Sequence, residues 1–426
     1  MKKVCVIGGG AAGLMCAYVA AQNGHSVVLI EKNEKLGKKI YITGKGRCNF
    51  TNDTPIEDFL QNVVRGQRFL KGALYAFSPQ KVMDFFEEQG LSIKTERGNR
   101  VFPSSDHASD VTKTLEKACK SVGVEIILNE KVNQLITMPN IIPTSDINQG
   151  SMRDVIPMTR IVGVKTDKNE YKCDCAVVAT GGMSYPTTGS TGDGYRFARE
   201  KGHSIVPLKS GLCGLNLIGN AHKTLQGLAL KNVCLTVKNQ EKTVYSGFGE
   251  MLFTHFGISG PLVLTASSYI NRLPLQNLSL CLDLKPALDA QTLDKRVLRD
   301  FEAHKNKKIS NALVDLLPQK LISFVLSAAR ISTEKNVNSI TKEERGNLLY
   351  ALKNLPLKVE SLRGFEEAII TSGGVELSEI NPKTMESKFV AGLKFAGEVL
   401  DVDALTGGFN MQIAFATGFM AGNTIK

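Results

Sequence analysis

The first 31 residues contain the feature that most restricts the fold, a complete strand-helix-strand unit around a glycine-rich turn. The apolar segment Lys3–Ile7 predicts a β-strand and runs directly into the pattern Gly8-x-Gly10-x-x-Gly13. A helix is expected to about Asn23, and a second strand then ends at Glu31. Gly8 permits a tight turn, Gly10 lets the backbone approach a pyrophosphate, and Gly13 lets the helix pack against the strand. The unit therefore predicts a dinucleotide site.

The residues of this turn also indicate how a dinucleotide is held. A helix N-terminus offers unpaired N–H groups and the positive end of the helix dipole to a diphosphate. Glu31 lies 23 residues after Gly8, where it is placed to accept hydrogen bonds from the ribose hydroxyls of an adenosine. A carboxylate there also disfavours a 2′-phosphate. We expect the contacts to come from Gly8, Gly10, Ala11, Ala12, Gly13 and Glu31.

The same stretch imitates a targeting or membrane segment, because Lys2 and Lys3 precede an unbroken apolar or glycine run from Val4 to Ala21. The core of a signal segment is one continuous apolar helix. Three consecutive glycines, with a helix starting after them, do not fit that requirement. We therefore expect neither a signal segment nor membrane association.

Composition narrows the class of protein. A chain of 426 residues forms about two or three domains, and 42% hydrophobic with 22% charged residues is ordinary for a globular protein. The nine cysteines are odd in number and scattered, which favours reduced thiols in the cytoplasm. Cys173 and Cys175 would share one face of a strand, but no second pair or histidine cluster completes a metal site. We expect no metal.

The positive charge is unevenly distributed. The chain has a formal net charge of +11, and residues 285–363 hold 15 Lys or Arg against 9 Asp or Glu, a net of +6. Such a surplus fits a surface that faces RNA, and it also fits a well-solvated helical surface with no partner. The sequence leaves both interpretations open.

Periodicity beyond the first unit predicts a discontinuous first domain. Residues 203–284 read as short β-runs and 290–355 as helices, whereas 389–426 return to strand, glycine-rich turn and helix and so close the N-terminal domain. An irregular loop is expected over 138–159. Further helices are predicted at Pro79–Gln89 and Ala108–Val122, and strands at Val124–Leu128, Lys131–Ile136, Arg160–Thr166, Tyr171–Val178, Leu228–Val237 and Thr243–Gly249.

Two glycine-bearing strand ends, 179–182 and 395–398, lie far apart in the sequence, as in a flavoprotein whose two segments surround FAD. The first is expected beside the phosphates and the ribityl chain. The second brings Glu398 and the helix start at 408–411 toward the ribityl chain and the flavin. N–H groups at that helix start would stabilise negative charge on the reduced flavin.

Five long motifs then carry a resemblance to a known family. They are Gly44-Lys-Gly-Arg-Cys-Asn-Phe-Thr-Asn52, the glycine-rich run 179–194, His255-Phe-Gly-Ile-Ser-Gly-Pro261, residues 379–388, and Phe395-Ala-Gly-Glu398 with Thr406-Gly-Gly-Phe-Asn410. In this order the chain resembles the BaiN/RdsA-type family of bacterial FAD-dependent oxidoreductases. The match spans nearly the whole chain.

The resemblance implies an α/β fold with a glutathione-reductase-like FAD-binding Rossmann domain. This domain (1–200 and 365–426) is interrupted by a β-barrel-like domain (201–284 and 355–364) that carries a helical insert (285–354). The resemblance also extends the set of expected FAD contacts to Lys32, Arg47, Asn49, Val132, Thr180, Gly181, Gly182, Glu398, Asp401, Gly408, Phe409, Asn410 and Met411.

The resemblance further implies reduction of a conjugated C=C bond with hydride taken from flavin N5, and NADH or NADPH as transient reductant. The favoured substrate is uridine in ribosomal RNA, bound through the basic helical insert and converted to dihydrouridine. The alternatives are a small steroid-like enone and a non-catalytic FAD- and RNA-binding assembly protein. Candidate proton donors are Cys48, Tyr185 and His255. The oligomeric state stays open.

Overall fold

The chain forms two units in the computed structural model, which describes residues 1–140, 159–219 and 221–426. One unit comprises Met1–Lys209 with Ile369–Lys426, and the other comprises Ser210–Ala368. The sequence-based division into three parts, with the helical insert as a domain of its own, stays a prediction. Most of the predicted loop 138–159 lies outside the described residues, and its ends belong to strands β8 (Val132–Pro139) and β9 (Thr159–Thr166).

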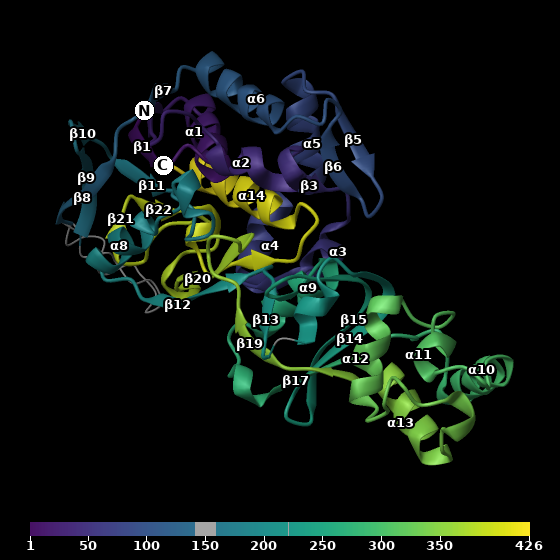
Figure 1. The fold of residues 1–426 in the computed structure, drawn as a ribbon. Coiled ribbons are helices and arrows are strands. Elements are labelled where there is room, and N and C mark those ends of the chain that lie inside the picture. The colour runs from purple at the N-terminus through teal and green to yellow at the C-terminus, as the bar shows by residue number, and fades with distance from the viewer. Residues whose placement is uncertain (141–158, 220) are drawn as a thin grey trace. The chain divides into compact units, whose positions relative to one another are not determined.

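The first unit is built on a five-stranded parallel sheet (Figure 1). Its strands read as continuous apolar runs because both faces are covered, which is typical of parallel sheets. In spatial order they are β22 (Leu393–Phe395), β11 (Cys175–Val178), β1 (Lys3–Ile7), β2 (Ser26–Ile30) and β7 (Glu125–Ile127). The sheet thus joins the two ends of the chain, as predicted.

Helix α14 (Phe409–Asn423) packs against helix α1 (Ala11–Gln22) (Figure 1). A Cβ added at Gly418 would lie 2.3 Å from the backbone oxygen of Ala12, and one at Gly422 would lie 2.6 Å from that of Cys16. Glycine at both positions therefore allows the two backbones to approach closely. The C-terminal helix is in this way fixed to the helix that follows the glycine-rich turn.

The remaining elements of the first unit surround the sheet. β9 pairs with β8, with β10 (Glu170–Lys172) and with β21 (Val390–Ala391). The other helices are α2 (Lys38–Ile42), α3 (Ile56–Gln61), α4 (Gln67–Ala76), α5 (Pro79–Glu88), α6 (Ala108–Ser121) and α8 (Asp193–Glu200). The other strands are β3 (Thr51–Asn52), β4 (Val63–Arg65), β5 (Ile93–Glu96), β6 (Arg100–Pro103), β12 (Ile205–Gly211), β20 (Ile370–Val375) and β23 (Asp403–Ala404).

The second unit is a seven-stranded antiparallel sheet whose core is shared with its helices. The strands in spatial order are β18 (Leu355–Leu357), β17 (Leu278–Asp283), β14 (Ala229–Asn239), β15 (Lys242–Phe253), β16 (Gly257–Ser259), β13 (Leu215–Leu217) and β19 (Val359–Leu362). The helices are α9 (Pro261–Ile270), α10 (Ala290–Ala303), α11 (Ile309–Ala312), α12 (Gln319–Ala328) and α13 (Lys342–Lys353). The predicted β-rich unit with helices is confirmed, and closure of its sheet into a barrel stays a prediction.

The structure corrects one predicted strand and contains one helix that was not predicted. The segment Tyr171–Val178 is not one strand, because β10 pairs antiparallel with β9 whereas β11 pairs parallel with β1. Cys173 lies in the link between them, so it does not share a strand face with Cys175. Helix α9, whose first residue is a proline that follows Gly260, lies within the stretch predicted to hold short β-runs.

Candidate functional site

Four strand ends meet at the carboxyl edge of the parallel sheet. The backbone N–H of Gly8, after β1, donates to Ile30 O at 2.9 Å, and that of Ala179, after β11, donates to Ile7 O at 2.9 Å. The N–H of Ala396, after β22, donates to Val178 O at 3.0 Å. In sheets of this type, ligands bind in the crevice outside the carboxyl ends of the strands. The glycine-rich turn and both remote strand ends therefore lie at one ligand-binding edge.

The glycine-rich turn is tight at two positions and open at the third. Gly8 has φ of 105°, a left-handed value that favours glycine, and a Cβ on Gly13 would lie 1.9 Å from Gly8 O. A Cβ on Gly10, in contrast, would meet nothing within 4 Å. Helix α1, with Ala11 and Ala12 in its first turn, starts without a side-chain cap. The open space at Gly10 thus lies at an uncapped helix N-terminus, which favours an anion.

Glu31 is fixed at the end of β2. It is 8% exposed, and its carboxylate accepts hydrogen bonds from the backbone N–H groups of Gly9 and Asn33, both at 2.8 Å, and from Asn33 Nδ2 at 2.7 Å. Two oxygens offer about four acceptor sites, so three donors leave room for one more. Its predicted contact with an adenosine ribose stays a prediction.

Lys32 and Val132 are two further predicted FAD contacts, and both stay predictions. Lys32 Nζ is 2.6 Å from both Thr191 Oγ1 and Asp193 Oδ2. Burial raises the pKa of Asp193, but the hydrogen bond and charge of Lys32 outweigh burial and lower it overall. Val132 is buried at the start of β8. Asp193 lies in the first turn of α8.

Arg47 binds two carboxylates in this structure. It is paired with Glu96 and with Asp106, which it contacts through Nε at 2.7 Å, and its guanidinium lies 4.3 Å from the centre of the Phe102 ring. Hydrogen bonds from Arg47 to Glu96, and from Lys94 and Arg47 to Asp106, lower the pKa of both carboxyls. In this structure the ion cluster holds the Arg47 side chain. The expected approach of Arg47 to the cofactor stays a prediction.

The two residues after Arg47, Cys48 and Asn49, have different surroundings. Cys48 is fully buried, and burial raises the pKa of its thiol to about 12, so Arg47 does not activate it as a thiolate. Asn49 Oδ1 is buried without a hydrogen-bond partner among the described residues. A Cβ added at Gly408 would lie 2.8 Å from this oxygen, which places Asn49 beside the start of α14.

The end of β11 also contains an unsatisfied acceptor. Thr180 Oγ1 is buried and has no hydrogen-bond partner in the part of the chain that the structure describes. Gly181 follows with φ of 72°, and a Cβ on Gly182 would lie 2.4 Å from Thr371 Oγ1. A buried hydroxyl without a partner costs free energy, so a ligand that satisfies it is favoured here.

The predicted residues of the C-terminal segment serve different purposes. Glu398 faces Lys39 and Ser184, and Asp401 Oδ1 accepts from the backbone N–H of Gly373 at 3.1 Å. Asn410 holds the turn before α14, since its Oδ1 accepts from Ala404 N and its Nδ2 donates to Ala404 O. Gly408 has a left-handed conformation and α14 starts there without a side-chain cap, with Phe409 buried and Met411 partly buried in its first turn.

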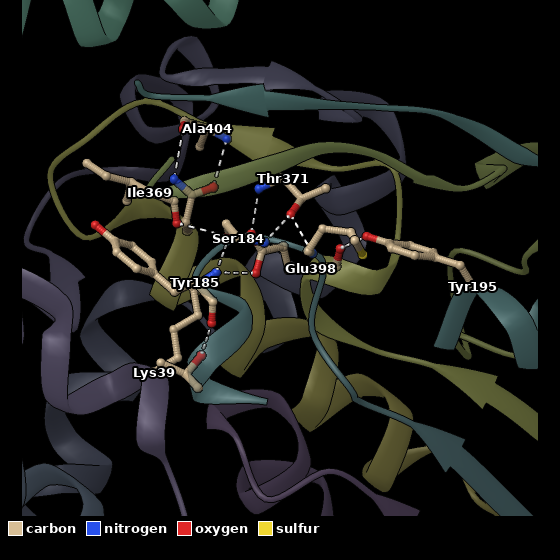
Figure 2. A network of polar contacts seen from close by, with 11 residues as sticks. Lys39, Ser184, Tyr185, Tyr195, Ile369, Thr371, Glu398 and Ala404 are labelled. Carbon is tan, nitrogen blue, oxygen red and sulfur yellow. Dashed lines mark hydrogen bonds and ion pairs between the residues drawn. The ribbon is translucent and has the colours of Figure 1, made fainter. Parts of the chain in front are cut away.

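Lys39, Ser184, Thr371 and Glu398 form a network that the sequence analysis missed (Figure 2). Lys39 Nζ is 2.7 Å from Glu398 Oε2 and 2.5 Å from Ser184 Oγ. Glu398 Oε1 accepts from the backbone N–H of Thr371 at 2.7 Å and lies 3.1 Å from Ser184 Oγ. The doublet Lys38-Lys39 was visible in the sequence, but nothing there distinguished one lysine from the other.

The two remaining candidate proton donors lie in different units. Tyr185 is half-buried in the first unit, one residue after Ser184, and has φ of 54°. A left-handed conformation is rare for a bulky residue and marks a site where the surrounding structure holds the chain under strain. His255 is exposed in the second unit and lies beside Phe256, 5.1 Å between ring centres.

No helix of the described residues is both long and apolar enough to cross a membrane. No group of three or more His, Cys, Asp or Glu side chains in the same residues is arranged to hold a metal ion.

Comparison with known proteins identifies the family. Residues 2–424 match the family described as "HI0933-like protein Rossmann domain". The chain belongs to this family. It is 30% identical to the ribosomal RNA dihydrouridine synthase of Haemophilus influenzae over 423 residues, 99% of this chain and 98% of the relative. It is also 30% identical to the Escherichia coli protein of the same name over 97% of this chain and 95% of the relative.

A third relative has a different substrate. The 3-dehydro-bile acid delta(4,6)-reductase of Clostridium scindens is 29% identical over 430 residues, 99% of this chain and 98% of the relative. The HI0933-like chain is thus an FAD-dependent oxidoreductase whose relatives include reductases of distinct substrates. The resemblance seen in the sequence is confirmed.

The residues present fit FAD. The open space at Gly10 lies at the uncapped start of α1, and Glu31 closes the neighbouring strand end. Asn49 Oδ1 and Thr180 Oγ1 are buried acceptors that lack partners in the described chain. A cofactor with a diphosphate and several N–H and O–H donors matches both features.

Proposed function

We propose that the chain reduces the C5=C6 bond of uridine in ribosomal RNA, which gives dihydrouridine. The observation that carries this proposal is the surplus of free positive charge on the second unit. FAD, when bound and reduced, would supply the hydride for C6, and NADH or NADPH is the proposed source of the two electrons that reduce it. The protein has to bind the RNA, orient the uracil ring and deliver a proton to C5.

The acids of residues 285–363 are largely paired, whereas several cations are not. Five acids here form ion pairs with Lys or Arg: Asp294 with Arg345, Asp300 with Arg296 and Arg299, Glu302 with Lys305, Glu334 with Lys308, and Glu344 with Lys335. Six exposed cations form no ion pair within the described residues: Lys295, Lys307, Lys320, Arg330, Lys342 and Lys358. Cations of this kind bind the phosphates of RNA and so release the counterions of the RNA, whereas a small enone offers no row of phosphates.

Tyr185 is the preferred proton donor among the three candidates. Cys48 is fully buried, which disfavours contact of its thiol with a substrate. His255 lies in the second unit, so its role rests on the resemblance alone. Tyr185 lies on the carboxyl side of β11, and its strained backbone supports a functional reason for its position.

Mass spectrometry of ribosomal RNA tests the proposal. A strain that lacks the gene should lose dihydrouridine at one or more sites, and a plasmid copy of the wild-type gene should restore it. A plasmid copy that cannot bind FAD, such as Gly13→Ala, serves as the control and should not restore it. Ribosomal RNA that keeps all its dihydrouridine in the deletion strain would contradict the proposal.

Reduction of a small enone is the second candidate, favoured by the full-length similarity to the bile acid reductase. The two substrates need the same chemistry, since each accepts hydride at one carbon of a conjugated C=C bond and a proton at the other. The non-catalytic assembly protein is not proposed, because the chain belongs to a family of enzymes.

A further inference from the structure

We infer that Lys39 is a cofactor-binding residue that holds a phosphate oxygen of FAD, and that Glu398 and Ser184 position its ammonium group. None of the motifs singled out in the sequence includes Lys39. The inference rests on the FAD site of the first unit and is independent of the substrate that the enzyme reduces.

Lys39 is placed beside the turn that receives the diphosphate. The backbone N–H of Gly37, two residues earlier, donates to Gly9 O at 2.8 Å, so the start of α2 is attached to the glycine-rich turn. In the C-terminal segment, a Cβ added at Gly397 would lie 2.9 Å from the Cβ of Ala12 in the first turn of α1. Glu398 follows Gly397 directly. The pair Lys39–Glu398 therefore lies next to the N-terminus of α1.

The Lys39 ammonium group is held by two hydrogen bonds and has one donor left for a ligand. Lys39 Nζ donates to Ser184 Oγ at 2.5 Å and to Glu398 Oε2 at 2.7 Å (Figure 2). An ammonium group has three donors, and the third makes no hydrogen bond within the described residues. The Lys39 side chain is 25% exposed, so this third donor is accessible to a ligand.

The opposite charges of Lys39 and Glu398 explain why the two side chains are paired. A carboxylate such as Glu398 near the start of α1 would by itself repel a diphosphate. Lys39 neutralises Glu398 and presents a positive donor, and hydrogen bonds between an ammonium group and phosphate are among the stronger ones in proteins. Glu398 in turn is held by the N–H of Thr371, and Ser184 by its contacts with Glu398 and Ile369 O. The network thus fixes the direction of the ammonium group.

Lys38 supplies a matched control. It neighbours Lys39 on the same short helix and carries the same charge, but its ammonium group pairs with Glu34 at 3.0 Å on the surface. Loss of charge at Lys38 therefore changes the net charge of the protein in the same way without touching the network.

The test is equilibrium binding of FAD, FMN and riboflavin to the full-length apoprotein, followed by flavin fluorescence at low and high salt. Lys39→Gln should weaken FAD and FMN binding about 10- to 100-fold, change riboflavin binding less than about 2-fold, and remove most of the salt dependence. Ser184→Ala should weaken FAD and FMN to a smaller extent and again spare riboflavin. Lys38→Gln should match the wild type.

Two results would overturn the inference. One is FAD binding by Lys39→Gln with wild-type affinity and salt dependence. The other is an equal loss of FAD and riboflavin binding in that variant, which would assign Lys39 a structural role. Lys39→Arg is the control for a folding defect in Lys39→Gln. It keeps the charge, so it should still bind FAD and FMN more tightly than riboflavin. Equal loss of binding of all three flavins in Lys39→Arg would also contradict the inference.

Discussion

Glu31 Oε2 accepts a 2.8 Å hydrogen bond from the backbone N–H of Gly9, so the acid at the end of β2 is attached to the turn that follows β1. The same carboxylate accepts from the backbone N–H of Asn33. Glu31 therefore orders two loops of the cofactor crevice before any ligand arrives. An acid at the end of the second strand thus has a structural use as well as its predicted contact with a ribose.

Gly10 and Gly13 should respond differently to the same added methyl group. Gly13→Ala places a Cβ 1.9 Å from Gly8 O, so the turn must move, and we expect a lower melting temperature and protein purified without flavin. Gly10→Ala meets nothing within 4 Å, so the apoprotein should melt as the wild type does while FAD binding weakens at least about 10-fold. Calorimetry and flavin absorbance measure both quantities. Equal melting temperatures for the two variants would contradict the packing described.

Tyr185→Phe removes the hydroxyl of the preferred proton donor. We expect C=C reduction to slow by about 100-fold, whereas reduction of the bound flavin by NADH or NADPH should be unchanged. Stopped-flow absorbance separates the two half-reactions. Tyr75→Phe is the control, because Tyr75 is 48% exposed and its hydroxyl bonds the surface acid Glu57. A Tyr185→Phe enzyme with both half-reactions at wild-type rate would exclude Tyr185 as the donor.

His203 should make the stability of the enzyme depend on pH. Its Nδ1 lies 3.1 Å from Glu379 Oε2 and its Nε2 lies 2.7 Å from Ser387 Oγ, an arrangement that satisfies a neutral ring. Burial lowers the pKa of His203, although the hydrogen bond to Glu379 opposes the shift. The unfolded chain thus binds this proton more readily, so stability is full above the unfolded pKa of about 6.5 and declines as the pH falls below it.

Unfolding measured between pH 5 and pH 8 tests this linkage. The wild type should lose stability below about pH 6.5, and His203→Gln, although less stable at every pH, should show a flatter profile in this range. His107→Gln is the control, because His107 lies at the exposed start of α6. A profile of His203→Gln parallel to that of the wild type would show that another group causes the pH dependence.

The unpaired cations of the second unit should contribute to RNA binding and not to the reduction of a small enone. Combined replacement of Lys307 and Arg330 by Gln should weaken binding of ribosomal RNA about 10-fold in physiological salt. Each lost phosphate contact reduces the part of the binding free energy that comes from counterion release. Reduction of a small enone should be unaffected. Gel-shift titrations at several salt concentrations measure the effect. The paired cation Lys335 offers a control, because Lys335→Gln removes a charge that Glu344 already neutralises.

Local patterns made part of this molecule predictable. Strand, glycines, helix and Glu31 lie within 31 residues, and their spacing alone indicates the turn that the structure contains. The Lys39 network was not predictable, because Lys39 and Ser184 are 145 residues apart and Lys39 and Glu398 are 359 apart. No periodicity reports such contacts. The ion cluster of Arg47 was missed for the same reason, since Glu96 and Asp106 come from separate segments.

Reoxidation of the reduced enzyme tests the central claim most directly. The purified FAD-bound enzyme is reduced anaerobically with NADH or NADPH, and unmodified ribosomal RNA or a steroid-like enone is then added while flavin absorbance is followed. The proposed function predicts that ribosomal RNA restores the oxidised flavin spectrum and gains dihydrouridine in matching amount, and that the enone reoxidises the flavin far more slowly. Rapid reoxidation by the enone, with no dihydrouridine formed in the RNA, would contradict it.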